Sequence, residues 1–460
     1  MTVTDSPLLI QRTTLAAPAG IVADDLTGAT DSAVQFARVG WTARLALTSP
    51  AAGTADTLAG SVTAVITDAR AQDSETANEG TALAVTGLMA SGIERLFVKV
   101  DSTLRGSVID QVTGALSSWS VRHPDALAVV CSAYPAMGRT IESGQLLVHG
   151  AGVHTTAIGR DPVTPVTTSA VAELLPGSVA LRLTSASAAE NAAQLQAAAV
   201  SSRIVAVDAV TDADLSTLAE AIALLGPRAI PTGAAGLAIA MSHVWASEDA
   251  ATVDPDGHAE SAETAAIQRV VVVVSSLHDV SRAQVDELMA QLPRDAVRTL
   301  TPTLEQALTP ASTAAWAERE LAGSPELPAV VVIASPSERP ARDVGQSKAP
   351  ASDLIAQSLA IISDAVISES PVGAIVLLGG EGARAVLATL GAESLVVRDT
   401  VREGIPIGVL EGGKADGITI VTKAGGFGTP TSVAEIVQEL FTTADAHDLF
   451  SGANTEGTLS

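Results

Sequence analysis

Short runs of β-branched residues alternate along the chain with longer stretches rich in Ala and Leu. A strand that leads through a helix into another strand is the pattern of parallel sheets with right-handed crossovers. Only 2% of the residues are aromatic although 47% are hydrophobic, so the core must consist mainly of Ala, Val, Leu and Ile. Aliphatic strands of this kind suit sheets that helices cover on both faces. The sequence therefore predicts an α/β fold of largely parallel sheets flanked by helices.

The predicted elements follow from these runs and from helical stretches between them. The predicted strands are residues 20–23, 43–47, 62–67, 96–100, 126–131, 204–207, 270–274, 330–333, 375–378 and 418–421. The predicted helices are residues 30–39, 75–89, 215–225, 281–291 and 383–390.

The length of 460 residues exceeds the usual size of one domain, so we expect two. The clearest boundary is 246–267, which holds six acidic residues and neither Lys nor Arg and is typical of a solvated linker. We therefore expect an N-terminal domain over 1–245 and a C-terminal domain over 268–445, each built on its own sheet, and a tail over 446–460. The polar stretch 335–353 is expected to be a loop.

The chain is strongly acidic, with 26 Lys and Arg against 51 Asp and Glu and a net charge of −25. This balance argues against non-specific nucleic-acid binding and against docking on anionic membranes. The lone cysteine, Cys131, excludes an intramolecular disulfide and a Cys-rich zinc site. The seven histidines show no metal-ligand spacing. The N-terminus lacks the pattern of a signal peptide, and the longest valine run is too short to span a bilayer, so we expect a cytoplasmic protein.

The first polar cluster follows the strand predicted over 20–23 and contains Asp24, Asp25 and Thr27. Ligands of open α/β sheets bind at the carboxyl ends of strands, where this loop is expected to lie. Adjacent carboxylates there could orient hydroxyl groups or hold Mg²⁺. The alternative is that Asp25 and Thr27 only form the capping turn of the next helix.

The second and third clusters also follow predicted strands and bring cations to a chain that has few. Lys99, Asp101, Ser102 and Arg105 lie within seven residues, and Arg is suited to a bidentate grip on carboxylate or phosphate. The alternative is a capped helix start in which Arg105 serves a salt bridge. Arg139 follows the strand predicted over 126–131 and is a further candidate for anion binding, although it is equally typical of a surface arginine.

Two glycine-rich turns follow predicted strands in the second half of the chain, Gly379-Gly380-Glu381-Gly382 and the segment from Lys423 to Gly428. A glycine turn at a helix N-terminus offers backbone N–H groups to phosphate. Neither turn is a Walker motif or a dinucleotide fingerprint. A purely structural turn is the alternative for each.

These motifs together resemble the four-carbon acid sugar kinases, the family of threonate, erythronate and 3-oxo-tetronate kinases. Six segments carry the resemblance in the family's order, from about residue 20 to about residue 435: ADDLTGATDSAVQFARVG (23–40), VKVDSTLRGSV (98–108), AYPAMGRTIESGQLLVHG (133–150), GAAGLA (233–238), LLGGEGARAVLATLG (377–391) and TKAGGFG (422–428).

The resemblance implies an N-terminal domain that binds the acid sugar and a C-terminal domain that binds ATP. It implies transfer of the γ-phosphoryl group to a terminal hydroxyl, with Mg²⁺ bridging charge. The residues implied to face the sugar acid are Asp24, Asp25, Lys99, Asp101, Ser102, Arg105 and Arg139. Those implied to hold ATP are Gly379, Gly380, Glu381, Gly425 and Gly426, with a serine after the first strand of the second domain. We expect Ser275, Ser276, Gly382 and Lys423 to belong to the same nucleotide site.

Phosphoryl transfer needs a carboxylate that accepts or orients the sugar hydroxyl proton and cations that stabilise spreading charge. We expect the carboxylate to be Asp101 or one of Asp24 and Asp25, and we expect Lys99 and Arg105 to face anionic groups.

The chain departs from the family pattern on the nucleotide side. Gly382 stands where the family commonly has Thr, and Ser275-Ser276 stand where it commonly has Gly-Ser. A non-catalytic sugar-acid-binding or regulatory paralogue is therefore an alternative, and a phosphatase or isomerase of phosphorylated sugar acids is another. A homodimer is a reasonable expectation, although no residue pattern demands it.

Overall fold

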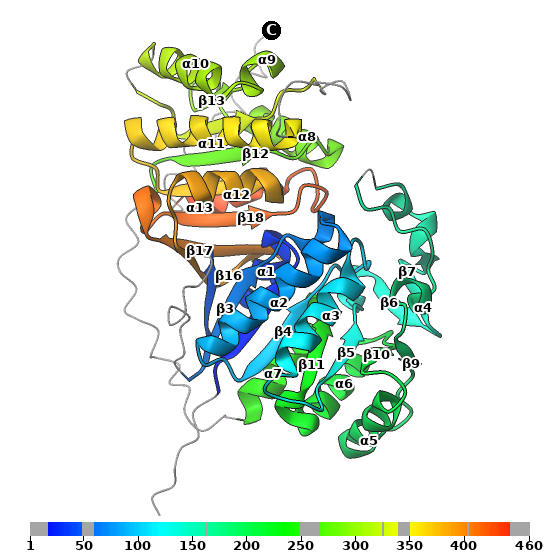
Figure 1. Ribbon diagram of the computed structural model, residues 1–460. Coiled ribbons are helices and arrows are strands. Elements are labelled where there is room, and N and C mark those ends of the chain that lie inside the picture. The colour runs from blue at the N-terminus through cyan, green and yellow to red at the C-terminus, as the bar shows by residue number, and fades with distance from the viewer. Residues whose placement is uncertain are drawn as a thin grey trace, which may run out of the picture.

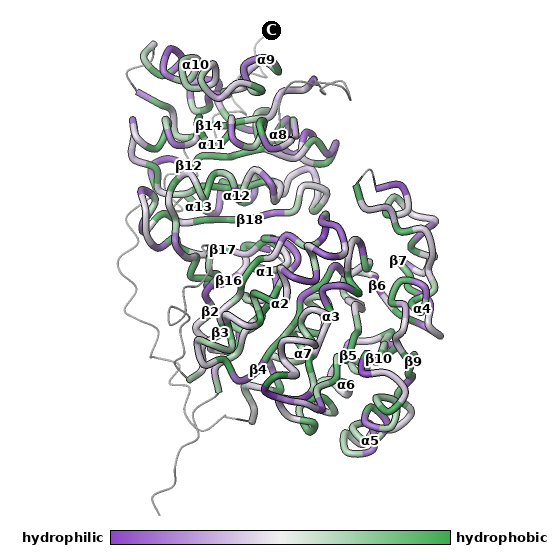
Figure 2. Tube along the Cα trace, viewed as in Figure 1, coloured by the Kyte–Doolittle hydropathy of each residue, from purple (hydrophilic) through white to green (hydrophobic). Residues whose placement is uncertain are grey.

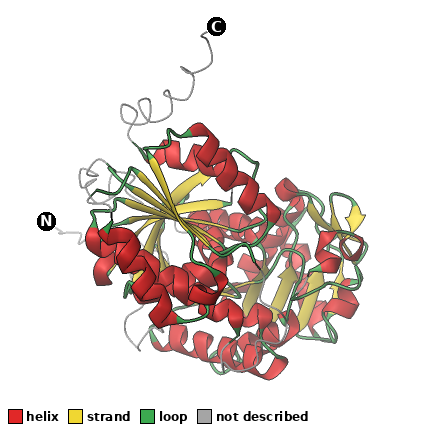
Figure 3. Ribbon diagram, turned by 90° about the horizontal axis from the view of Figure 1, so that it is seen from above, coloured by secondary structure: helices red, strands yellow, loops and turns green. Residues whose placement is uncertain are grey.

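The computed structural model describes residues 17–47, 59–161, 163–248, 267–323, 326–338, 350–402 and 404–441. Most of the predicted linker, the middle of the polar stretch 335–353 and the predicted tail lie outside these ranges. Within them the chain forms a mixed α/β structure with helices on both faces of its strands (Figures 1 and 3). The predicted fold class is confirmed.

The strands that the N-terminal half contributes to the main sheet are parallel to one another, in the order β2-β3-β1-β4-β11-β5-β10-β9. Their bounds are β1 (Ala19–Ala23), β2 (Thr42–Ala46), β3 (Ser61–Ile66), β4 (Arg95–Lys99), β5 (Leu127–Cys131), β9 (Val179–Leu181), β10 (Ile204–Val207) and β11 (Ala229–Gly233). The helices are α1 (Leu26–Ala37), α2 (Ser74–Ala90), α3 (Val108–Trp119), α4 (Val171–Leu174), α5 (Ala188–Ala199), α6 (Asp212–Leu225) and α7 (Ala235–Glu248).

The C-terminal half contributes the parallel strands β13-β14-β12-β15-β18 and the antiparallel pair β17-β16. The strands are β12 (Val270–Val274), β13 (Val297–Leu300), β14 (Val330–Ala334), β15 (Ala374–Leu378), β16 (Ser394–Arg402), β17 (Ile405–Glu411) and β18 (Thr419–Lys423). The helices are α8 (Asp279–Gln291), α9 (Leu304–Ala307), α10 (Pro310–Ala322), α11 (Ala351–Glu369), α12 (Gly380–Thr389) and α13 (Ser432–Leu440).

The two halves share one 15-stranded sheet because β16 pairs antiparallel with β2. The paired residues run from Ser394 with Ala46 to Val397 with Ala43. Helix α1 crosses this junction, and the Thr30 hydroxyl lies 3.1 Å from the Thr422 hydroxyl on β18, with both side chains buried. The sequence predicted separate sheets, so their edge-to-edge union is a new feature.

Every predicted strand has a counterpart in the sheet, with ends that differ by at most two residues. The sequence did not predict β9, β11, β13, β16 and β17 of the main sheet, nor the three short strands within 139–152. In β16, the charged residues Arg398 and Asp399 interrupt the apolar run. The core is aliphatic, as predicted: all five residues of Val270–Val274 are buried, and hydrophobic segments coincide with the strands in Figure 2. Trp119, Phe36 and Phe97 are the largest apolar side chains that are fully buried.

Helix α11 is long and apolar enough to cross a membrane by length and composition alone. Its residues Leu359, Ile362 and Val366 are fully buried, and it packs against α10, α12, β12 and β14. These contacts are those of a core helix beside a sheet.

Candidate active site

The predicted polar clusters meet at one edge of the N-terminal sheet because β3, β1, β4, β11 and β5 are adjacent and parallel, so their carboxyl ends coincide. A cavity of about 200 Å³ lies there. Its lining from the N-terminal half includes Asp25, Gly28, Arg70, Lys99, Asp101, Ser102, Arg105, Tyr134 and Arg139, and from the C-terminal half it includes Gly404, Ala424 and Phe427. Both halves of the chain therefore contribute to one cavity.

Arg70 lies at the centre of the carboxylates and was missed by the sequence reasoning. It belongs to a short 3₁₀ turn, Ala69–Ala71, after β3. Its Nε and Nη2 donate to Asp24 at 2.9 and 3.0 Å, and its Nη1 lies 2.6 Å from Asp25. Its Nη2 lies 3.9 Å from Asp101. The strand-end rule that selected the other clusters also applies to the segment after residues 62–67 and could have found it.

Asp24 does not line the cavity. Its side chain is fully buried, and both of its oxygens accept hydrogen bonds from Arg70. Burial raises its pKa, partly offset by the positive charges of Arg70 and Lys99. Burial likewise opposes the charged form of Arg70, but Asp24, Asp25 and Asp101 raise the pKa of its guanidinium well above the ordinary value. This buried pair supports the site from beneath.

Asp25 combines the two roles that the sequence left open. Its Oδ1 accepts a hydrogen bond of 2.6 Å from the Gly28 backbone and so caps α1, and its Oδ2 pairs with Arg70. Its side chain is 27% exposed and lines the cavity, unlike that of Asp24. Asp25 is therefore a carboxylate that a ligand can reach.

Asp101 has hydrogen-bond partners at both oxygens. Oδ1 accepts from the backbone and the hydroxyl of Thr103 at 3.0 and 2.6 Å, and Oδ2 accepts from Nε and Nη2 of Arg105 at 3.0 and 2.7 Å. Burial opposes ionisation, but Arg70 and Arg105 hold the pKa of Asp101 well below its usual range. Asp101 is thus a firm anchor for Arg105 and is poorly suited to take up a proton.

Lys99 and Arg139 line the cavity without a carboxylate partner among the described residues. The Lys99 ammonium donates to the Val100 carbonyl at 3.0 Å, and Arg139 donates to the Met137 carbonyl. A Cβ atom on Gly28 would lie 2.6 Å from the Lys99 Nζ and from the Asp25 Oδ1, so a larger residue there would displace the ends of these two side chains. Burial lowers the pKa of Arg139. Both cations therefore line the cavity without a direct ion pair among the described residues.

The predicted nucleotide residues gather at the carboxyl ends of β12, β15 and β18, which are neighbours in the sheet. The Ser276 backbone donates to the Leu378 carbonyl at 3.2 Å, and the Ser281 hydroxyl donates to the Gly425 carbonyl at 2.6 Å. Gly379, which adopts a φ of +102°, donates to the Lys423 carbonyl at 3.1 Å. This group consists of Ser275, Ser276, Gly379, Gly380, Glu381, Gly382, Lys423, Gly425 and Gly426, none of which lines the cavity, although Ala424 and Phe427 beside them do.

Lys423 occupies the same position on β18 that Lys99 occupies on β4. Each ends its strand, is buried and donates to the carbonyl of the next residue, at 2.9 Å for Lys423 and Ala424. Burial lowers the pKa of Lys423 to about 8. Glu381 is the acidic member of the group, and burial together with Asp353 raises its pKa.

The two departures from the family pattern lie in contact. A Cβ atom on Gly382 would fall 2.2 Å from the Ser275 Cβ and 2.6 Å from its hydroxyl. The Ser275 hydroxyl donates to the Leu378 carbonyl at 3.0 Å. The serine therefore occupies the space that a larger residue at position 382 would need.

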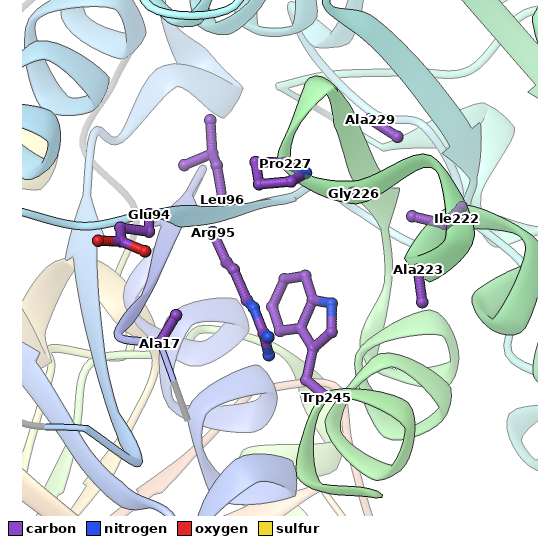
Figure 4. A pocket seen from close by; sticks show the side chains of 10 residues that line it. All are labelled: Ala17, Glu94, Arg95, Leu96, Ile222, Ala223, Gly226, Pro227, Ala229 and Trp245. Carbon is purple, nitrogen blue, oxygen red and sulfur yellow. The ribbon is translucent and has the colours of Figure 1, made fainter. Parts of the chain in front are cut away.

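A second cavity of about 210 Å³ lies at the opposite, amino ends of the strands. Figure 4 shows Arg95 and Trp245 beside one another in it, and the Arg95 guanidinium lies 5.7 Å from the indole centre. It contains none of the predicted site residues.

Comparisons with known proteins match each half of the chain to a different domain family. A sugar-binding N-terminal domain profile matches residues 19–241, and a nucleotide-binding C-terminal domain profile matches residues 271–433. The chain is 39% identical to the D-threonate kinase of Bordetella bronchiseptica over 89% of this chain and 94% of that protein. It is 28% identical to the D-threonate kinase of Salmonella typhimurium over 90% and 96% of the two chains.

Further relatives are named D-erythronate kinase, from Heliobacterium modesticaldum, and 3-oxo-tetronate kinase, from Methylobacterium radiotolerans. A solved structure from Salmonella typhimurium shares the fold, with a TM-score of 0.71 at 19% identity over 92% of this chain and all of that one.

Proposed function

The chain belongs to the family of four-carbon acid sugar kinases, which are phosphotransferases, and from this we propose that it transfers the γ-phosphoryl group of ATP to a terminal hydroxyl of a four-carbon acid sugar. D-threonate is the first candidate because the relative with 39% identity over nearly its whole length is named a D-threonate kinase. D-erythronate and 3-oxo-tetronate are the other candidates.

The observation that carries the proposal is that Lys99 and Arg139 line the same small cavity and that neither forms an ion pair with a carboxylate among the described residues. A volume of about 200 Å³ suits a compact polyol acid. Asp24 and Asp101 lie near enough to influence these two cations, but neither cation forms a direct ion pair with a carboxylate of the described residues, which favours a ligand that brings negative charge. We assign the substrate carboxylate to Arg139 and the neighbouring Arg105.

Asp25 is the carboxylate we assign to the acceptor hydroxyl. It reaches the cavity, whereas Asp24 is buried behind it and Asp101 is held ionised by its partners. The contact of Asp25 with Arg70 fixes its orientation. Its oxygen can accept the hydroxyl proton or align the hydroxyl for attack, which is the main demand of phosphoryl transfer on such a group.

The nucleotide is assigned to the glycine turns after β15 and β18. Ala424 and Phe427 line the cavity, so a phosphate chain on the turn after Lys423 would end beside the substrate. The described residues contain no cluster of three or more His, Cys, Asp or Glu side chains suited to a metal ion, and Arg70 occupies the space between Asp24, Asp25 and Asp101. We therefore assign Mg²⁺ to the nucleotide phosphates, on which it would neutralise developing charge.

The test is coupled ADP release with Mg-ATP and a panel of D-threonate, D-erythronate, 3-oxo-tetronate and longer sugar acids. We expect ADP to be released only when one of the four-carbon acids is present.

The alternative function is a non-catalytic sugar-acid-binding paralogue, which the glycine at position 382 suggests. Thermal shift separates the two: a kinase is stabilised by ATP and by the acid separately, whereas such a paralogue responds to the acid alone. Stabilisation by the acid without any ADP release would overturn the kinase assignment.

A further inference from the structure

An insert between β5 and β9 leaves the main sheet and returns to the substrate cavity. It contains a small antiparallel sheet of β6 (Arg139–Glu142), β7 (Gln145–Val148) and β8 (Ala151–Gly152), seen at the right of Figure 1, and then two 3₁₀ turns that end at Arg160. Asp161 follows directly after the second turn. The insert therefore supplies Arg139 at one end and an acidic side chain at the other.

Asp161 reaches across to Arg105, which is 56 positions earlier in the chain. Its Oδ2 accepts a hydrogen bond of 3.1 Å from Arg105 Nη1. Its Oδ1 accepts from the backbone N–H groups of Val163 and Thr164, both at 2.9 Å. The Asp161 carboxylate is therefore held by its own loop, and it is 20% exposed where it meets the guanidinium.

The donors of Arg105 can be counted. A guanidinium has five N–H donors in a rigid plane. Nε and one hydrogen of Nη2 go to Asp101, and one hydrogen of Nη1 goes to Asp161. One N–H group remains on each terminal nitrogen, and Arg105 lines the cavity. Two carboxylates from different parts of the fold thus fix the plane of the guanidinium and leave a pair of donors unused.

We propose that Asp161 is a positioning residue: from the insert it locks the guanidinium of Arg105 so that the two remaining N–H groups bind the carboxylate of the acid substrate. The inference rests on the proposed function, because it specifies how that site recognises an acid. It also explains why Arg139 and Asp161 lie on the same insert, since the segment that brings one cation to the cavity also orients another.

The charge of Asp161 and its orientation of Arg105 predict opposite changes in anion binding when Asp161 is removed. Removing a negative charge beside Arg105 should strengthen anion binding if only the net charge matters. Removing the partner that fixes the guanidinium should weaken anion binding if its orientation matters. The direction of the change in KM for the acid therefore separates the two effects.

The experiment measures KM for the acid sugar, KM for ATP, kcat and Tm for Asp161→Ala and Asp161→Asn. We expect Asp161→Ala to raise KM for the acid about tenfold, the loss typical of one charge-assisted hydrogen bond. KM for ATP, kcat and Tm should stay near wild type. Asp161→Asn, which keeps an oxygen for the two backbone N–H groups, should give an intermediate KM and guards against misfolding of the alanine variant.

The matched control is Asp125→Ala. Asp125 pairs with Arg228 at the same distance of 3.1 Å, is 66% exposed and does not line the cavity. This variant should leave all four quantities unchanged.

An unchanged or lower KM for the acid in Asp161→Ala, or a parallel rise in KM for ATP, would overturn the positioning role. Wild-type protein without turnover would instead refute the proposed function. Calorimetric titration with the acid alone would then test Asp161 separately. We expect Asp161→Ala to bind the acid about tenfold more weakly than the wild type. Equal affinity in the two proteins, or no binding to the wild type, would refute the role of Asp161.

Discussion

Replacing Arg70 by Met should destabilise the protein in a strongly pH-dependent manner. Methionine keeps an unbranched side chain of similar length but removes both hydrogen bonds that Arg70 gives to Asp24. Asp24 is fully buried, so it would be left as a charge without its partner. Asp25 is partly exposed and Asp101 keeps Arg105, so Asp24 bears most of the cost.

The magnitude follows from the proton that Asp24 must take up to become neutral. Its ordinary pKa is 3.8, so at pH 7 protonation is opposed by about three pH units, each worth about 1.4 kcal/mol. The destabilisation at pH 7 should therefore approach about 4 kcal/mol, within the range of about 3–5 kcal/mol for removing one partner of a buried ion pair. Because the folded variant would bind a proton that the unfolded chain releases, its stability should rise as the pH falls from 7 to 5.

Urea unfolding followed by tryptophan fluorescence at pH 5, 6 and 7 measures this effect. The difference between wild type and Arg70→Met should shrink by about 3 kcal/mol from pH 7 to pH 5. The control is Arg70→Met with Asp24→Asn, which has no buried carboxyl to protonate and should lose that pH dependence. A difference that is constant over this range, or equal in the single and double variants, would refute the reasoning.

Three further predictions concern the cations and the nucleotide turn. The pKa of Lys423 is about 8 in the folded state against 10.5 for an ordinary lysine, so the free energy of unfolding of the wild type should gain a contribution that grows from pH 8 to pH 10.5. Urea unfolding of Lys423→Met should show no such contribution, and the same rise in both proteins would contradict the burial argument. Gly382→Ala should lower the free energy of unfolding by about 1–3 kcal/mol despite the better helix propensity of Ala, because its Cβ would meet Ser275, and adding Ser275→Gly should restore it. Thermal unfolding that shows a stabilised single variant would disprove the contact. Arg139→Ala should raise KM for the acid at least tenfold with KM for ATP unchanged, and Arg139→Lys should recover part of the loss; steady-state kinetics in which both KM values rise together would argue against a carboxylate contact.

Several predicted site residues share one cavity because one rule applied throughout: polar loops that follow buried strands meet at one edge of a parallel sheet. That rule brought Asp25, Lys99, Arg105 and Arg139 into one cavity. The segment after β3 carries Asp68 and Arg70, so the same rule applied there would have found Arg70.

Other features lay beyond local pattern. Spacing does not reveal which oxygens are already engaged, so it left Asp24, Asp25 and Asp101 equivalent, whereas their burial and partners distinguish them. Asp161 meets Arg105 although the two residues are 56 positions apart in the chain, and no local motif encodes such a contact. The pairing of β16 with β2 likewise depends on two distant edge strands meeting.

The central claim is that the substrate cavity and the nucleotide turns together transfer phosphate from ATP to a four-carbon acid. Its most direct test is ³¹P NMR of the purified protein with Mg-ATP and D-threonate, D-erythronate or 3-oxo-tetronate. The account predicts that the γ-phosphate signal disappears while a phosphomonoester appears in equal amount with ADP, only when a four-carbon acid is present. Release of inorganic phosphate at a rate indifferent to the acid, or unchanged ATP with every acid offered, would contradict it.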